Sequence, residues 1–246
     1  MKHTKYLNRP TAVSDGLATE YLPLELKGKL NEMMLQRTKR HTLEMLPSLQ
    51  MDTFWWHPSE KIREHYAACC ATKVEDGSDQ FCASMERFHE LRNILNAEDS
   101  PKFTIITSLV KGYLALGEFV IISSICKERT LNVLEKKLKD AGLRVGRIDG
   151  DVRPTKRQDI IESDAFDVLL LSTLAAGEGI DLPRYSRVII ANLSWTPAHD
   201  DQLIARAHRF GQTKMVHVVF LISAGTIGKS IKLAAFLLHC EIHFTH

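Results

Sequence analysis

From residue 101 onward, short runs of β-branched residues alternate with amphipathic segments of helical period. Because this rhythm is typical of βαβ units, it predicts an α/β domain with a parallel sheet covered by helices on both faces. Ligands of such sheets bind at the carboxyl ends of the strands, so functional residues are expected there. The predicted strands are Phe119–Ser123, Arg144–Ile148, Asp167–Ser172, Arg187–Ala191 and Val216–Ile222, and the predicted helices are 127–141, 155–163, 199–208 and 226–239.

The first 100 residues have a different pattern, which is helical and irregular. Apolar residues recur at helical spacing between Leu26 and Leu35, and again between Phe81 and Leu95. Between them, "SEKIREHYAACCATK" begins with Ser59, a residue type that caps helix N-termini. Helix packing explains these apolar stripes better than a cofactor site does. We therefore expect a mostly helical region over residues 1–100 and the α/β domain over residues 101–246.

The composition is that of a globular protein, with 44% apolar and 25% charged residues among 246. A formal net charge of +2 means that any affinity for nucleic acid comes from local basic patches. No apolar run approaches the roughly 20 residues that cross a bilayer, and the N-terminus has no signal-peptide core, so we expect an intracellular protein without membrane contact. Five cysteines without CxxC spacing argue against a disulfide framework and a zinc cluster.

One segment, "SAGTIGKS" (Ser223 to Ser230), is similar to a phosphate-binding loop. Such a loop needs a Gly five residues before its Gly-Lys-Ser, so that successive N–H groups can face a phosphate. Counting back from Gly228 places Ser223 at that position. This single mismatch leaves two interpretations open, a nucleotide site that uses Lys229 or an ordinary turn.

Two further segments carry residues that suit phosphate binding. "STLAAGEGIDL" follows a predicted strand and combines the hydroxyls of Ser172 and Thr173 with Gly179 and Asp181. Its small residues would let N–H groups approach a phosphate, although a glycine-rich turn is often only a turn.

The second segment is "LSWTPAHDDQLIARAHRFGQ", where Arg206 and Arg209 lie three apart on a predicted helix, with Gln202 four residues before Arg206. The two guanidinium groups could converge on one anion, because the planar fork of Arg binds phosphate oxygens bidentately. The alternative is a solvated basic face.

Together these segments carry a family resemblance. "STLAAGEGIDL" and "VIIANLSWTPAHDDQLIARAHRFGQTKMVHVVFLISAGTI" closely resemble motifs V and VI of SWI/SNF-type ATPases, a branch of the superfamily 2 helicase-like enzymes. "FVIISSICKERTLNVLEKKLKDAGLRVGRIDGDVRPTKRQDII" resembles the motif IV region, and "MLQRTKRHTLEMLP" is similar to a stretch near the end of the first ATPase lobe. The resemblance begins near residue 20 and implies a RecA-like second lobe preceded by helical inter-lobe segments.

The resemblance also implies cofactors, partners and roles for residues. In this family two RecA-like lobes close over ATP and Mg²⁺ while gripping duplex DNA, without separating its strands. Arg206 and Arg209 match the motif VI arginines that reach the nucleotide phosphates and act as arginine fingers. Gln202 matches the first residue of that motif, and Gly179 and Asp181 match positions near the ribose and phosphates.

Other matches concern DNA and the end of the lobe. Ser123, Ser172 and Thr173 match positions that contact DNA phosphates, whereas Leu174 replaces a common Arg and removes one basic contact. "SAGTIGKS" matches the turn and helix after the last strand, where Gly225 would form the turn and Thr226 the N-cap. The resemblance implies a nuclear location and a role in chromatin, transcription or repair.

The sequence lacks two motifs that the family places in its first lobe. No Gly-x-x-x-x-Gly-Lys-Thr precedes residue 119, and Asp-Glu-x-His does not occur. We therefore expect the isolated chain neither to bind ATP tightly nor to hydrolyse it, unless a first lobe is supplied in cis or in trans. The alternatives are a non-catalytic DNA- or protein-binding module derived from such an ATPase, and a separate NTPase that uses Lys229.

Overall fold

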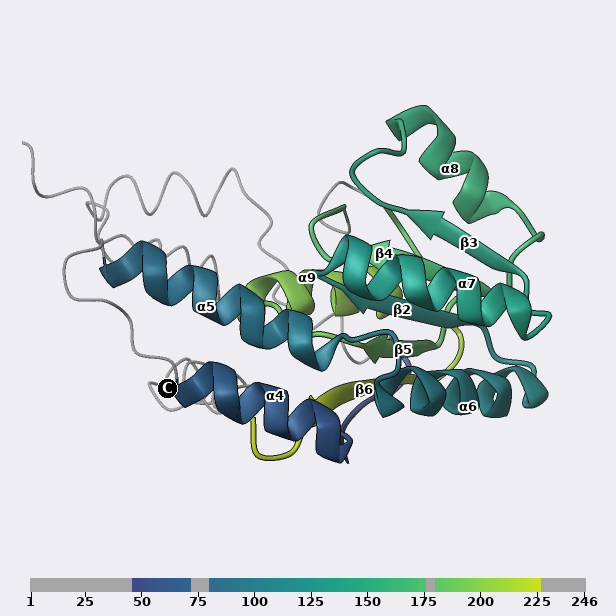
Figure 1. Ribbon diagram of the computed structural model, residues 1–246. Coiled ribbons are helices and arrows are strands. Elements are labelled where there is room, and N and C mark those ends of the chain that lie inside the picture. The colour runs from purple at the N-terminus through teal and green to yellow at the C-terminus, as the bar shows by residue number, and fades with distance from the viewer. Residues whose placement is uncertain (1–45, 72–79, 176–179, 227–246) are drawn as a thin grey trace, which may run out of the picture. The chain divides into compact units, whose positions relative to one another are not determined.

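The computed structural model describes residues 46–71, 80–175 and 180–226, and for residues 80–85 it describes the backbone alone. The described residues from 47 onward form one compact unit, to which all the described helices and strands belong. Its centre is a six-stranded sheet in the order β1-β6-β5-β2-β4-β3, in which every neighbouring pair is parallel (Figure 1). The strands are β1 (Leu49–Trp56), β2 (Val120–Ser124), β3 (Val145–Ile148), β4 (Val168–Ser172), β5 (Arg187–Ile190) and β6 (Val216–Ser223).

Helices cover both faces of the sheet (Figure 1). One face packs against α4 (Glu60–Ala71), α5 (Gln80–Leu95), α6 (Pro101–Ala115) and α7 (Val133–Asp140), and the other face packs against α8 (Pro154–Glu162) and α9 (Pro197–Ala207). A π-helical turn, η1 (Lys127–Asn132), leads into α7.

The strands contribute side chains to two hydrophobic cores, one on each face of the sheet, because successive side chains of a strand point to opposite faces. In β2, Val120 and Ile122 join the core under α4 to α7, whereas Ile121 joins the core under α8 and α9. This double burial explains why the inner strands are apolar almost throughout.

The five predicted strands are confirmed, and each strand end lies within one residue of its expected position. The expected helices around 127–141, 155–163 and 199–208 are also present, the first as η1 continued by α7. Ser59 stands at the start of α4, where its carbonyl oxygen accepts a hydrogen bond from the Arg63 N–H at 2.9 Å. The predicted helix at 226–239 and the one around Leu26 to Leu35 lie outside the described residues.

The sequence pattern missed two elements. β1 forms the edge of the sheet, and its apolar side chains Met51 and Trp55 stay exposed, so it lacks the buried apolar run of the inner strands. α6 begins at Pro101, which suits the first position of a helix. β1 pairs with β6, so the region expected to be mostly helical contributes the edge strand of the sheet.

The segment similar to a phosphate loop begins as a turn. Ser223 is the last residue of β6, and Gly225 has φ +72°, the left-handed region that glycine adopts readily. The Thr226 hydroxyl donates to the Ser223 carbonyl oxygen at 3.1 Å. These contacts support the interpretation as a turn, and Gly228 and Lys229 lie outside the described residues.

None of the described helices is long and apolar enough to cross a membrane. Within the ranges that the structure describes, no three His, Cys, Asp or Glu side chains are grouped as a metal site.

Candidate functional site

Two arginines meet at a single carboxylate. Arg209 Nη1 donates a hydrogen bond to Asp181 Oδ1, and Arg206 Nη1 lies 3.9 Å from the same oxygen. The side chains of Asp181 and Arg209 are about half exposed, whereas Arg206 is three-quarters buried. The structure thus brings together three of the predicted site residues on a surface that a solute can reach.

The two arginines converge by a different route from the one expected. α9 ends at Ala207, so Arg206 lies in its last turn and Arg209 lies beyond it, rather than on the same helix. The Leu182 N–H donates to the Arg206 carbonyl oxygen at 3.0 Å, which joins the segment before β5 to the end of α9. Backbone pairing, and not helical spacing alone, therefore places Asp181 beside both guanidinium groups.

The turn after α9 is held by Gly211 and Gln212. Gly211 has φ +99°, and a Cβ built there would lie 3.7 Å from Pro183 Cβ. The buried Gln212 amide donates to the carbonyl oxygens of Tyr185 at 3.1 Å and Ala207 at 3.3 Å, and its oxygen accepts the N–H groups of the next two residues. These bonds fix the backbone that carries Arg209.

Two more residues were predicted for the nucleotide site, Gln202 and Gly179. Gln202 is exposed on α9, where Leu203 and Ile204 are buried. Gly179 lies outside the described residues.

The three predicted DNA-binding residues lie at the carboxyl ends of two paired strands. Ser123 on β2 and Thr173 just after β4 are both buried, and their hydroxyl oxygens are 3.0 Å apart in a hydrogen bond to each other. Ser172 is partly exposed, and the neighbouring Leu174 side chain is 61% exposed. The first two hydroxyls therefore join the strands, and of the three only Ser172 has a side chain open to solvent.

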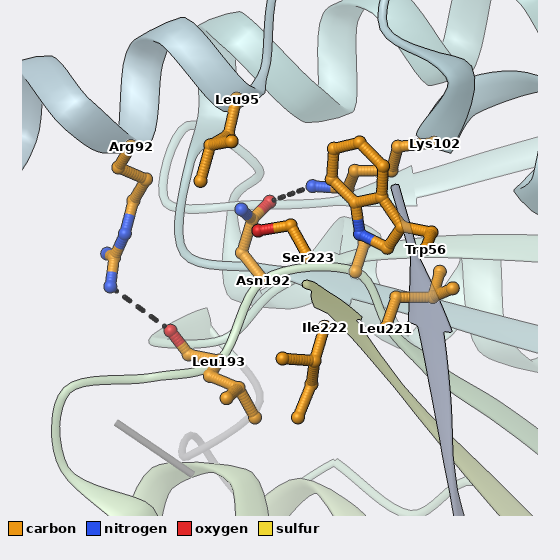
Figure 2. A pocket seen from close by; sticks show the side chains of 10 residues that line it. Trp56, Arg92, Leu95, Lys102, Asn192, Leu193, Leu221, Ile222 and Ser223 are labelled. Carbon is orange, nitrogen blue, oxygen red and sulfur yellow. Dashed lines mark hydrogen bonds between the residues drawn. The ribbon is translucent and has the colours of Figure 1, made fainter. Parts of the chain in front are cut away.

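A buried polar network at the same edge was not predicted. Lys102 Nζ donates to Asn96 Oδ1 at 2.6 Å. It also donates to Asn192 Oδ1 at 2.9 Å (Figure 2). Asn192 Oδ1 also accepts the hydroxyls of Ser124 and Thr130, each at 3.0 Å. Burial lowers the pKa of Lys102 to about 7. The sequence held one sign of this buried network. Lys102 lies on the same helix as Phe103 and Ile106, which both belong to the core.

Comparison with known proteins points in one direction. The model of the helicase conserved C-terminal domain matches residues 86–211. The DNA excision repair protein ERCC-6-like of Danio rerio is 31% identical over 159 residues, which are 63% of this chain and 11% of that protein. The DNA repair and recombination protein RAD54B of Mus musculus is 36% identical over 141 residues, which are 54% of this chain and 16% of that protein. The chain thus spans only a small part of the length of these relatives.

Two solved structures show the same fold. The C-terminal part of the Fun30 ATPase domain has a TM-score of 0.63 at 20% identity and covers 77% of this chain and 89% of that one. The Sulfolobus solfataricus SWI2/SNF2 ATPase core in complex with dsDNA has a TM-score of 0.64 at 24% identity and covers 90% of this chain and 51% of that one.

Proposed function

The chain belongs to the SWI/SNF-type family of helicase-like ATPases and carries its C-terminal RecA-like lobe, and we propose that this lobe supplies arginine fingers and DNA contacts to a DNA-dependent ATPase and translocase. The observation that carries the proposal is the convergence of Arg206 and Arg209 on Asp181. Two guanidinium groups within reach of one oxygen can also bind the oxygens of a phosphate.

In this proposal Asp181 holds the arginines until nucleotide arrives. ATP and Mg²⁺ are bound mainly by a first lobe, and closure brings the γ-phosphate to the arginine pair. Arg209 then exchanges Asp181 for phosphate oxygens, which leaves the Asp181 carboxylate available to accept a ribose hydroxyl. Arg206 and Arg209 stabilise the charge that develops during phosphoryl transfer, an effect worth about 10³ to 10⁵ in rate for arginine fingers.

The proposed DNA contacts lie at the carboxyl edge of the sheet. The partly exposed Ser172 hydroxyl is suited to donate to a phosphate oxygen of duplex DNA. Ser123 and Thr173 hold the ends of β2 and β4 together through their mutual hydrogen bond, and we propose that they position the backbone N–H groups that face DNA. One solved structure of the same fold contains dsDNA, which supports DNA as the partner. We place the function in the nucleus, in chromatin, transcription or repair.

The test is an ATPase assay on the purified 246-residue chain, with and without duplex DNA, followed by addition of a first lobe from a relative as a separate chain. We expect background turnover from the chain alone and DNA-stimulated turnover once the first lobe is present. Robust DNA-stimulated turnover by the chain alone would contradict the dependence on a first lobe.

The exposed Leu174 favours a second candidate, a non-catalytic DNA- or protein-binding module. An apolar side chain that is 61% exposed suits a contact with another protein better than a contact with phosphate. This candidate predicts that adding a first lobe produces no ATP turnover. It also predicts that Leu174→Arg strengthens DNA binding but still gives no ATP turnover.

A further inference from the structure

A small cavity lies at the carboxyl edge of the sheet, between strand ends and the helices α5 and α6 (Figure 2). Its volume is about 50 Å³. Trp56 and Ser223 end β1 and β6, Asn192 follows β5, Arg92 lies on α5, and Lys102 lies on α6. This cavity is separate from the Asp181 and Arg209 pair, and none of its residues has a role in the function proposed above.

Two buried cations line the cavity. Arg92 is 7% exposed and Lys102 is 1% exposed. Lys102 donates to the neutral amide oxygens of Asn96 and Asn192, and Arg92 donates to the Leu193 carbonyl oxygen at 3.2 Å. In the part of the chain that the structure describes, neither cation has a carboxylate partner. A buried charge without a counter-charge is costly, so these two cations favour the binding of an anion.

An unused hydrogen-bond donor reinforces this preference. An ammonium group has three N–H donors, and among the described residues Lys102 uses two of them. Trp56, which is 3% exposed, adds an aromatic wall to the cavity. In Figure 2 the Asn192 side chain lies between Arg92 and Lys102, with Leu95 and Ile222 on the apolar walls. The cavity therefore offers a hydrogen-bond donor and positive charge beside apolar walls.

We propose that this cavity binds a small monovalent inorganic anion of the size of chloride. Since a water molecule needs about 10 to 15 Å³ of such volume, the cavity can hold an ion of that size but not a nucleotide. A bound anion would compensate both cations and join α5 and α6 to the ends of β1, β5 and β6.

The charge of Lys102 makes this binding depend on pH. Burial lowers the pKa of Lys102 to about 7, a shift that a charged Cys126 thiolate would oppose and that the nearby Arg92 reinforces. Burial raises the pKa of Cys126, so that thiol stays neutral at pH 7. Asn96 and Asn192 do not titrate. Anion affinity is therefore higher at pH 6 than at pH 8.

The experiment measures thermal unfolding of the full chain at pH 6.5 in mixtures of sodium chloride and sodium gluconate at constant ionic strength, since gluconate is too large for the cavity. For a Kd of about 10 mM, 100 mM chloride should raise Tm by about 3 to 6 °C. Lys102→Met should abolish this response, and Lys136→Met, a matched change at an exposed lysine, should retain it.

Asn192→Asp tests the same idea without removing a cation. The new carboxylate stands 2.9 Å from Lys102 Nζ and supplies the missing counter-charge, so Tm in gluconate should rise and the chloride response should disappear. Crystals grown in bromide should show an anomalous peak in the cavity. An unchanged chloride response in both Lys102→Met and Asn192→Asp, or a cavity that stays without bromide, would overturn the proposal.

Discussion

The Glu118 carboxylate accepts two hydrogen bonds from the Arg187 guanidinium, with Nη2 2.7 Å from Oε1 and Nε bonded to Oε2. This bidentate pair joins the turn before β2 to the first residue of β5, and both side chains are at most 15% exposed. Its hydrogen bonds hold the pKa of Glu118 below its usual range. A lowered folded-state pKa means that the pair stabilises the fold above the unfolded pKa of about 4.3, and that this stability is lost as pH falls through the folded pKa.

Glu118→Gln should therefore remove part of the acid dependence of stability. At pH 7 the substitution leaves Arg187 without its anion, and we expect a loss of about 3 kcal/mol in the free energy of unfolding. The difference between wild type and variant should shrink as pH falls toward 3. Urea titrations from pH 3 to 7 measure it, and a constant difference across this range would contradict the role of the ion pair.

Arg206→Ala and Arg209→Ala should each abolish most of the turnover of a reconstituted two-lobe enzyme. Loss of an arginine finger lowers the rate about 10³-fold or more. ATPase rates with saturating DNA measure this effect, and duplex DNA binding should change little because the proposed partner of both arginines is the nucleotide. Arg153→Ala, at an exposed arginine before α8, is the control that should keep its activity. Equal rates in wild type and both site variants would refute the assignment.

Thr173→Val should destabilise the fold by roughly 1 to 3 kcal/mol, because it leaves the buried Ser123 hydroxyl without its partner. In the double variant with Ser123→Ala, the loss in the free energy of unfolding should be smaller than the sum of the two single losses. The reason is that the second substitution removes the hydroxyl that the first one leaves without a partner. Chemical denaturation of the four proteins in a double-mutant cycle measures the coupling. Strict additivity would show that the hydrogen bond contributes nothing.

Ser172→Ala should leave stability nearly unchanged and weaken duplex DNA binding several-fold, because this partly exposed hydroxyl is the one proposed to contact phosphate. Fluorescence anisotropy with a labelled duplex measures the affinity. A matched Ser163→Ala at the end of α8 should bind DNA as wild type does. If both variants bind equally well, Ser172 makes no energetically significant contact.

Gly211→Ala should destabilise the protein by about 1 to 2 kcal/mol, since φ +99° is strained for a residue with a Cβ. Because Gly211 follows the backbone that carries Arg209, turnover of the reconstituted enzyme should fall as well. Gly112→Ala is the matched control, because a Cβ at Gly112 in α6 meets no atom within 4 Å and alanine favours the helix. A Gly211→Ala protein as stable as wild type would contradict the strain.

The inner strands were predictable because helices cover both faces and almost every residue must be apolar. The edge strand β1 was not predictable, because Met51 and Trp55 remain exposed and the segment lacks a buried apolar pattern. It is a strand because its backbone pairs with β6. The helix α6 was missed for a related reason, since its β-branched residues have no strong preference for a helix until they pack against the sheet.

The sequence by itself indicated the fold class, because periodicity is a local property of a chain, and its resemblance to known motifs indicated the family. The role of the two motif arginines stays a prediction. Only the tertiary structure decided which side chains meet across the sheet. Parallel neighbours such as β2 and β4 are joined by long crossovers, so the contacts of Ser123 with Thr173 leave no trace in local pattern. The same holds for Lys102, whose burial between Asn96 and Asn192 depends on segments up to 90 residues apart and creates the proposed anion site.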